Sequence, residues 1–344
     1  MDIAQRKQKI LAAVIENYIL NGEPVGSKVL EKSEDFNVSS ATIRNELADL
    51  TTLGLLKQPH TSAGRVPTQM GYRFYVDNLL DVEPLSDRVS SYIQNRLRKV
   101  CDAPEHILQG AADLLCEITG TTAIATTPTG EDTRVRKIKF VQTGRYTAMM
   151  VLITSSGMVK SRLFRCDFDI TSEMLNLFDR ALNERLAGEP LSNINQPFIQ
   201  TFAASFGELS LLMADMLIAV MDACKEASSV NVYLSGATKL LHHSDNDLFN
   251  SLTLLEYLSD NSNNEKLLRN VPDGTNIYIG RENPQRELNK NSLIATRYAI
   301  GNQPAGTIAL ITPLRFDYGK AVAIAENVAQ TVGYLIEEVI TTEK

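Results

Sequence analysis

The feature that most restricts the fold is a short amphipathic helix that begins near residue 39 and is followed at once by a polar hairpin. Ser39 or Ser40 can cap this helix, because a serine hydroxyl accepts hydrogen bonds from the unpaired backbone N–H groups of a first turn. Apolar residues at helical spacing predict its buried side, and they are Ile43, Leu47 and Leu50. Gly54 is the expected stop signal.

The hairpin after this helix consists of two predicted strands, at 55–58 and 65–68. The Pro-His-Thr-Ser-Ala-Gly segment at 59–64 is the predicted turn between them, with Arg65 near the tip and Lys57 on the stem. Gly64 is expected to supply a positive φ in this turn.

Two further helices are predicted upstream. The first has an apolar stripe within 10–19 and stops at Asn21-Gly22-Glu23-Pro24, and the second is short and begins at Ser27. Helix, turn, helix and polar hairpin in this order are typical of a winged helix-turn-helix. We therefore expect a DNA-binding domain over residues 1–80.

The outer face of the third helix has small and polar side chains. At 100° per residue, the positions opposite the apolar stripe are Ala41, Asn45, Ala48 and Thr52. Asn and Arg can pair with base edges, and Ser or Thr with phosphates. An isolated helix of this kind is more often simply exposed to solvent, but the hairpin that follows favours DNA binding.

The predicted DNA contacts come from this helix and from the hairpin. Arg44, Asn45 and Arg65 are the best candidates, and Lys57 is expected to contact phosphate. The complete candidate set is Ser39, Ser40, Ala41, Thr42, Arg44, Asn45, Lys57, His60, Thr61, Ser62 and Arg65.

The net charge of −7 at first argues against a nucleic-acid partner. DNA, however, responds to the local field of the face that it meets. Residues 1–80 contain nine Lys/Arg and nine Asp/Glu, so this segment is neutral and the acidity lies in the remainder of the chain. The distribution of charge is therefore compatible with an N-terminal DNA-binding domain.

Other classes of function find little support. The four cysteines are far apart and form no C-x-x-C pair, so we expect neither a zinc site nor disulfides. No P-loop, G-x-S-x-G or H-E-x-x-H motif occurs, so we expect no cofactor and no enzyme. No apolar run is long enough for a membrane span, and no signal peptide precedes the first helix, which predicts a cytoplasmic protein without a membrane partner.

The rest of the chain alternates between strand and helix patterns. Helices are expected at about 86–101 and 103–119, strands from 123 to 164, mostly helical sequence from 171 to 245, further strands from 276 to 312 and a final helix at 317–340. This order suggests one α+β domain interrupted by another. An unusually apolar helix expected at 202–223 fits either a buried core or a subunit interface.

Three runs resemble the HrcA family: Thr-Ile-Arg-Asn-Glu-Leu at 42–47, Pro-His-Thr-Ser-Ala-Gly-Arg-Val-Pro-Thr at 59–68, and Gly-Tyr-Arg-Phe-Tyr-Val at 71–76. The first is also found in close variants among other winged-helix regulators, whereas the second and third are far more restrictive. The resemblance implies an α+β multidomain protein with an N-terminal winged helix-turn-helix, a GAF-like domain (86–170 and 246–344) and an inserted, mostly helical dimerisation domain (171–245).

The same resemblance implies a function. HrcA-like proteins are repressors of chaperonin and DnaK operons that bind an inverted-repeat operator, CIRCE, as homodimers, and the GroEL chaperonin keeps them active. An alternative is a winged-helix regulator whose GAF-like domain senses a metabolite, which predicts a pocket with converging polar groups. An enzyme with an attached DNA-binding domain instead predicts a cleft with perturbed titratable groups.

Overall fold

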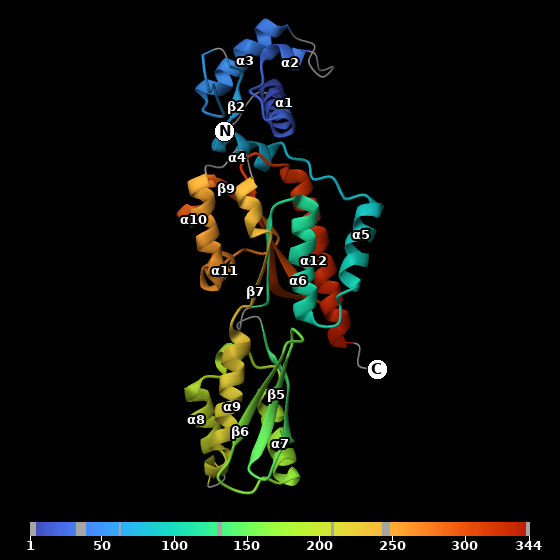
Figure 1. Cartoon of the computed structure of the whole chain (residues 1–344), viewed down its shortest axis with the longest axis vertical. Helices are drawn as coiled ribbons and strands as arrows, with labels where there is room; N and C mark the ends of the chain where they lie inside the picture. Colours follow the sequence, from blue (N-terminus) through green and yellow to red (C-terminus); the bar gives the residue numbers. More distant parts are fainter. Residues whose placement is uncertain are drawn as a thin grey trace.

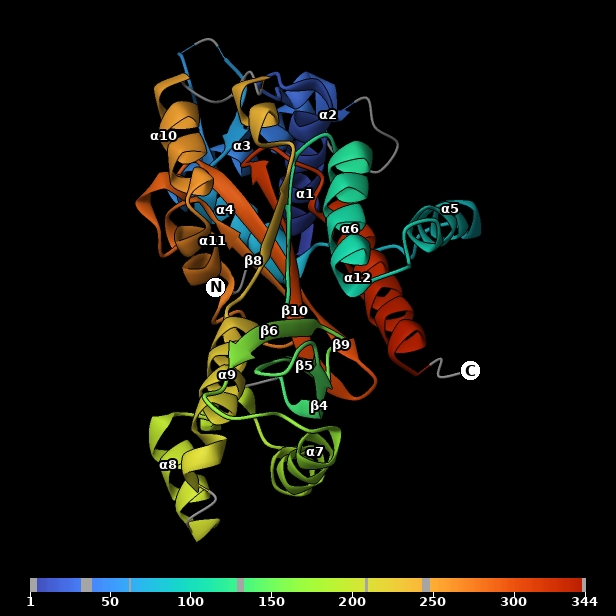
Figure 2. The same ribbon diagram turned by 60° about the horizontal axis from the view of Figure 1, so that its bottom comes forward.

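The chain forms three stacked parts along one long axis (Figure 1). The computed structural model describes residues 5–31, 39–61, 63–128, 133–207, 210–242 and 248–341. A small N-terminal unit lies at one end, a five-stranded sheet with its helices in the middle, and a three-stranded sheet with its helices at the other end (Figures 1 and 2). The protein is therefore a mixed α/β chain.

The N-terminal unit contains four helices and a two-stranded hairpin. Its elements are α1 (Gln5–Asn21), α2 (Ser27–Glu31), α3 (Ser40–Thr52), β1 (Leu56–Lys57), β2 (Val66–Pro67) and α4 (Gln69–Asn78). β1 and β2 pair antiparallel, with Leu56 opposite Pro67 and Lys57 opposite Val66. The loop between α1 and α2 pairs with the hairpin as well, because Val25 and Arg65 form an antiparallel bridge with backbone hydrogen bonds of 2.9 and 2.8 Å.

The predicted apolar stripes form the core of this unit. All three inward positions of α3 are buried, and they pack with Ile10, Leu11, Val14 and Ile15 of α1. Gly54 has a φ of 76° directly after α3, so it ends the helix in the left-handed conformation that glycine adopts without strain. The predicted second helix begins at Ser27 as expected, and its described part runs to Glu31.

Gly64 is needed for a different reason from the one expected. Its φ is not positive. Instead, an added Cβ would lie 2.5 Å from the backbone carbon and oxygen of Val25 and 2.7 Å from the carbonyl carbon of Pro24. The hairpin therefore requires glycine because the α1–α2 loop packs directly against it.

The middle part is an antiparallel sheet in the order β7-β3-β10-β9-β8. Its strands are β3 (Thr122–Thr126), β7 (Val232–Ser235), β8 (Thr275–Ile279), β9 (Asn291–Ile300) and β10 (Gln303–Pro313). Helices α6 (Pro104–Thr119) and α12 (Tyr318–Thr341) cover one face, with α5 (Asp87–Arg98) beside them, and α10 (Leu248–Ser259) and α11 (Asn261–Leu268) cover the other.

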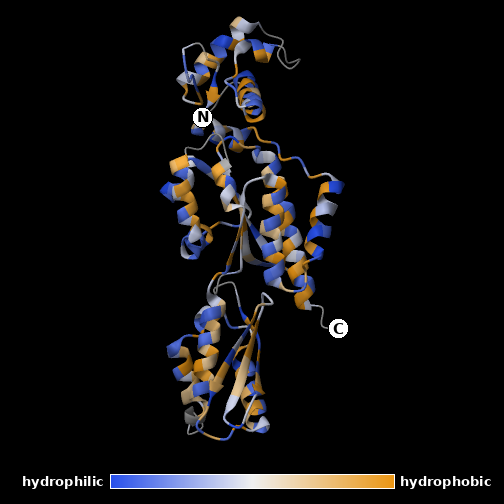
Figure 3. Ribbon diagram, viewed as in Figure 1, coloured by the Kyte–Doolittle hydropathy of each residue, from blue (hydrophilic) through white to orange (hydrophobic). Residues whose placement is uncertain are grey.

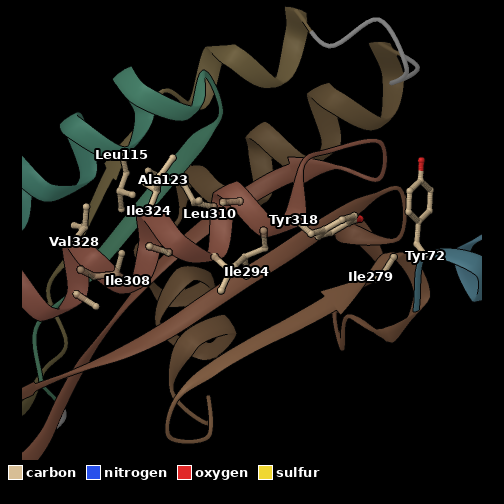
Figure 4. Close-up of a cluster of buried hydrophobic side chains, with 14 of the residues drawn as sticks. Tyr72, Leu115, Ala123, Ile279, Ile294, Ile308, Leu310, Tyr318, Ile324 and Val328 are labelled. Atoms are coloured by element: carbon tan, nitrogen blue, oxygen red, sulfur yellow. The ribbon is translucent and has the colours of Figure 1, made fainter. Parts of the chain in front are cut away.

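Successive side chains of a strand point to opposite faces of the sheet, so each strand contributes to the apolar core on both faces. Ile308 and Leu310 of β10 pack toward α6 and α12 (Figure 4). Ala309 and Ile311 belong instead to the cluster beneath α10 and α11. A strand buried on both faces reads as a continuous apolar run, which is what the sequence has here. β7 was not predicted, because its four residues lie within the stretch expected to be helical.

The third part is built around the three-stranded antiparallel sheet β4-β5-β6. Its elements are β4 (Val135–Gln142), β5 (Thr147–Thr154), β6 (Val159–Arg165), α7 (Ser172–Leu186), α8 (Gln196–Ala204) and α9 (Ser210–Ser228). These strands share a core with α7, α8 and α9 and not with the five-stranded sheet. The structural break thus falls near residue 133 instead of at the expected boundary of 171.

The prediction of a single helix over 202–223 is wrong. α8 ends at Ala204 and α9 begins at Ser210, and Gly207 between them has a φ of 58°. The apolar side chains of α9 mostly face their own unit: Met213, Met216, Leu217, Val220 and Ala223 are all buried in its core. The helix is therefore core within one chain.

Exposed apolar residues gather on the outer face of the three-stranded sheet, opposite α7–α9. Cross-strand pairing places Val141, Met149 and Leu163 in one row and Lys137, Ile153 and Val159 in another, with Lys139, Val151 and Ser161 between them. Val141, Val159 and Leu163 are 43%, 55% and 69% exposed, and the strands are visibly apolar in Figure 3. We call this surface the open sheet face.

The N-terminal unit is held against the five-stranded sheet by α4. Gln69 Nε2 donates to the carbonyl of Ile279 at 2.7 Å, and Arg73 Nη1 donates to that of Ile277 at 2.9 Å. Both acceptors belong to the edge strand β8, so α4 covers a sheet edge. The Tyr72 ring packs 5.9 Å from that of Tyr318, which joins the two parts in one core (Figure 4).

A second attachment comes from the loop before α12. Arg315 Nη1 donates to the carbonyl of Ile19 at 3.1 Å, and its guanidinium lies 6.0 Å from the centre of the Tyr18 ring. The cation thus meets the last turn of α1, where the helix dipole favours positive charge. The N-terminal unit is fixed at both α1 and α4.

The packing of Gly64 against the α1–α2 loop predicts the effect of Gly64→Ala. The added methyl forces the hairpin away from Val25, and we expect a loss of about 1–3 kcal/mol in local stability. Hydrogen-exchange protection of the α3 amides measures it. Gly26→Ala is the matched control, because its Cβ would meet nothing within 4 Å, and it should cost less than about 0.5 kcal/mol. Equal effects of the two variants would contradict this packing.

Candidate nucleic-acid interface

The orientation of α3 is set by ion pairs with α1. Arg6 donates to Glu46 Oε1 through Nε at 2.8 Å and Nη2 at 2.5 Å, and Lys7 Nζ lies 2.8 Å from Asp49 Oδ2. The Glu46 side chain is only 8% exposed, and the hydrogen bond to Asp49 raises the pKa of Lys7. Glu46, inside the run that carries the family resemblance, is therefore a structural clamp on the inner side of the helix.

The two serines at the start of α3 are used within the protein. Ser39 is the N-cap, and its hydroxyl accepts from the Thr42 backbone N–H at 3.3 Å. Ser40 donates its hydroxyl to that of Ser27 at 3.0 Å and so ties α3 to α2. Ser39 is exposed and Ser40 partly so. Their first effect is to fix where α3 begins.

The outer face of α3 is exposed as predicted. Ala41, Asn45, Ala48 and Thr52 are all exposed, and Arg44 is exposed beside them. The side chains of this face are small, and Asn45 is the longest of these four that can form hydrogen bonds. It has the shape and chemistry of a helix that can approach base edges closely.

The hairpin loop is organised by Gln58, which sequence reasoning missed. Its Nε2 donates to the carbonyls of Thr61 at 2.9 Å and Ala63 at 3.0 Å, so one side chain shapes the turn. His60 and Thr61 are exposed in this loop, and Lys57 is exposed on β1. Ser62 lies outside the described residues. From the sequence alone, a glutamine next to a polar turn cannot be told apart from one that is simply exposed to solvent, so this role of Gln58 could not be predicted.

Arg65 lies at the base of the loop and not at its tip. Its backbone pairs with Val25, and its Nε donates to Thr51 Oγ1 of α3 at 3.0 Å. It therefore links the hairpin, the α1–α2 loop and the end of α3. The structure brings Arg65 near Arg44, since both line one groove of about 440 Å³ between α2, α3 and the hairpin.

A larger cavity of about 750 Å³ lies between α4, β8 and α12. Its charged lining residues are Arg73, Asp77, Glu282 and Glu326. Arg73 donates to the carbonyl of Ile277 and lies 3.4 Å from the carboxylates of Asp77 and Glu282. Glu326 accepts a hydrogen bond from the Thr275 hydroxyl at 2.7 Å. Arg73 thus serves the attachment of α4 to β8, and Glu326 ties α12 to the same strand.

The part of the chain that the structure describes contains neither a metal-binding cluster nor a membrane-spanning helix. No three His, Cys, Asp or Glu side chains lie together in a way that holds a metal ion. Among the described helices, none combines the length and the apolar character needed to cross a bilayer.

Comparison with known proteins decides the family. Residues 105–322 match the model of the HrcA protein C-terminal domain. The chain is 33% identical over 342 residues to the "Heat-inducible transcription repressor HrcA" of Clostridium botulinum (strain Eklund 17B / Type B), covering 98% of both chains. The chain belongs to the HrcA family. The similarly named protein of Desulfitobacterium hafniense is 32% identical over 340 residues, again with 98% of both chains covered.

A solved structure has the same overall fold as this HrcA-family chain. It is described only as a hypothetical protein, is 24% identical, and covers 98% of this chain and 100% of its own with a TM-score of 0.65. The HrcA relatives are named as transcription repressors and not as enzymes, in line with the absence of a catalytic motif from the sequence.

Proposed function

We propose that this chain is a heat-inducible transcription repressor that binds double-stranded operator DNA through its N-terminal unit. The observation that carries the proposal is the exposed, small and polar outer face of α3 beside the β1–β2 hairpin. We interpret this unit, residues 1–80, as a winged helix-turn-helix, with α3 in the major groove and the hairpin as the wing. The names of the relatives support the repressor role.

The remainder of the chain divides into two further domains in this proposal. The five-stranded sheet and its helices form the GAF-like domain, and the part around β4–β6 and α7–α9 forms the inserted dimerisation domain. The separate apolar cores of these two parts support the division. In this proposal the insertion begins near 133 and not at the expected 171.

The proposed operator is the inverted repeat CIRCE, bound by a homodimer. An inverted repeat has two-fold symmetry, and a dimer with a two-fold axis presents one reading helix to each half-site. A second copy of this chain is the proposed occupant of the open sheet face. β5 has apolar residues on both sides, a pattern of strands buried on both faces, whereas the helices of its own chain pack on one.

The open sheet face also supports modulation by the GroEL chaperonin. In a lone chain, Val159 and Leu163 are exposed within one apolar surface, and such surfaces promote aggregation and attract chaperones. The active dimer covers this face. Competition by unfolded proteins for GroEL then lowers the amount of active repressor during heat shock, and transcription rises.

The DNA part of the proposal is tested by comparing a CIRCE-type duplex with a scrambled duplex at the same stated salt concentration. We expect a clear preference for the inverted repeat. Asn45→Ala should cost about 1–3 kcal/mol on the operator and much less on the scrambled duplex, because it removes a base contact. A wild-type chain that binds both duplexes equally would contradict the proposal.

The dimer is tested with Leu163→Glu, which places a charge on the edge strand β6 at the most exposed apolar position of the open sheet face. Two carboxylates would lose water at a symmetric interface, so we expect dimerisation to weaken by about two orders of magnitude. Sedimentation equilibrium measures the change. Leu177→Glu on α7 is the control, since Leu177 is 57% exposed and lies away from this face. A Leu163→Glu protein that stays dimeric would rule out this interface.

Chaperonin dependence is tested by incubating purified protein for hours at growth temperature with GroEL, with an equal mass of albumin, or alone. We expect operator-binding activity to be lost more slowly with GroEL than in the other two samples, because the chaperonin binds the exposed open sheet face. Identical decay in all three samples would exclude the chaperonin from the account.

A further inference from the structure

The groove beside α3 has walls from three elements. Gly26, Ser27 and Lys28 of the α2 region form one wall, Arg44 of α3 forms the second, and Gln58, Thr61 and Arg65 of the hairpin form the third. Its volume is about 440 Å³. The groove lies along the side of α3 that faces the hairpin and α2.

The charge of this groove has one sign. Lys28, Arg44 and Arg65 line it, and no Asp or Glu is among the described residues that do so. Lys28 and Arg44 are exposed. Arg65 is held in place by Thr51 and Val25, so one cation is fixed by the fold before any ligand arrives. The groove therefore suits an anion.

The position of Arg44 on the helix decides which anion. Arg44 and Asn45 are neighbours in the chain, so they point about 100° apart around the axis. An α-helix about 10–12 Å across nearly fills a major groove about 12 Å wide, so its leading face meets the bases and its flanks meet the two backbones. Asn45 is on the leading face, and Arg44 is on the flank that borders the groove.

We infer that this groove binds a phosphodiester segment of the duplex, with Lys28 and Arg44 as its mobile cations and Gln58 shaping its hairpin wall. Arg44 is then a backbone contact that positions α3, and Asn45 is the residue that reads a base. The inference rests on the proposed DNA-binding function and divides its roles between two adjacent side chains, both of which the sequence alone allowed as base contacts.

The test measures binding to the inverted repeat and to the scrambled duplex over a range of salt concentrations. We expect Arg44→Ala to weaken binding to the inverted repeat and to the scrambled duplex by the same factor, and Lys28→Ala should likewise affect the two duplexes equally. Each should also reduce the slope of log K against log salt by about 0.9, the value for one phosphate contact. Asn45→Ala should reduce operator affinity alone, by about 5- to 150-fold. All three side chains are exposed, so the fold should survive, and circular dichroism verifies this.

Arg44→Lys separates the two roles of Arg44 directly. Lysine keeps the point charge that a phosphate needs but lacks the fork that pairs with a guanine. We expect near wild-type binding to both duplexes. Arg88→Ala on α5 is the control for charge removal, because Arg88 is exposed and lies outside the groove, and it should leave the salt slope unchanged.

The outcomes distinguish the inference from the function on which it rests. A wild-type protein without preference for the inverted repeat would overturn the proposed function. A wild-type preference that Arg44→Ala or Arg44→Lys abolishes, with an unchanged salt slope, would make Arg44 a base-reading residue and overturn the inference alone.

Discussion

The docking of α4 on the edge strand β8 is the contact on which the rest of the arrangement depends. Gln69 and Arg73 satisfy backbone groups of the sheet edge, and Tyr72 enters the same core as Tyr318. Arg315 adds a second point of attachment at the end of α1. Because α3 is packed on α1, its direction is fixed relative to the sheet. The proposed dimer would therefore present two copies of α3 at a defined separation.

The three-stranded sheet at the opposite end of the molecule offers the surface through which the proposed dimer would set the distance between its two α3 helices. β5 is apolar on both sides, and the α7–α9 helices cover only one of them. Burying the other side is favourable by roughly 25 cal/mol per Å² of apolar surface, which is the gain that the proposed dimer would provide. The same surface would be exposed in a lone chain, so our proposal assigns both dimerisation and chaperonin binding to one face.

Sequence reasoning predicted those features that depend on local pattern. The buried stripe of α3, its serine cap and most strands and helices follow from periodicity and capping, and they are present. Tertiary contacts decide the rest. Gly64 is required by the approach of Val25, and Arg65 is held by Thr51. The strands β4–β6 belong with the helices that follow them, which spacing along the chain does not reveal. β7 is too short to stand out from its helical surroundings.

The central claim is that one dimer reads both halves of an inverted repeat with two fixed α3 helices. Its most direct measurement is binding to operators whose half-sites are separated by five additional or ten additional base pairs. About 10–10.5 base pairs make one helical turn of about 34 Å, so five turn one half-site to the far side of the duplex. Ten restore its face but add about 34 Å to a separation that the account holds fixed, so both insertions should release one half-site. The account predicts that either insertion reduces affinity to that of a single half-site, with two chains bound per native operator. Undiminished affinity with either insertion, or one chain per operator, would contradict it.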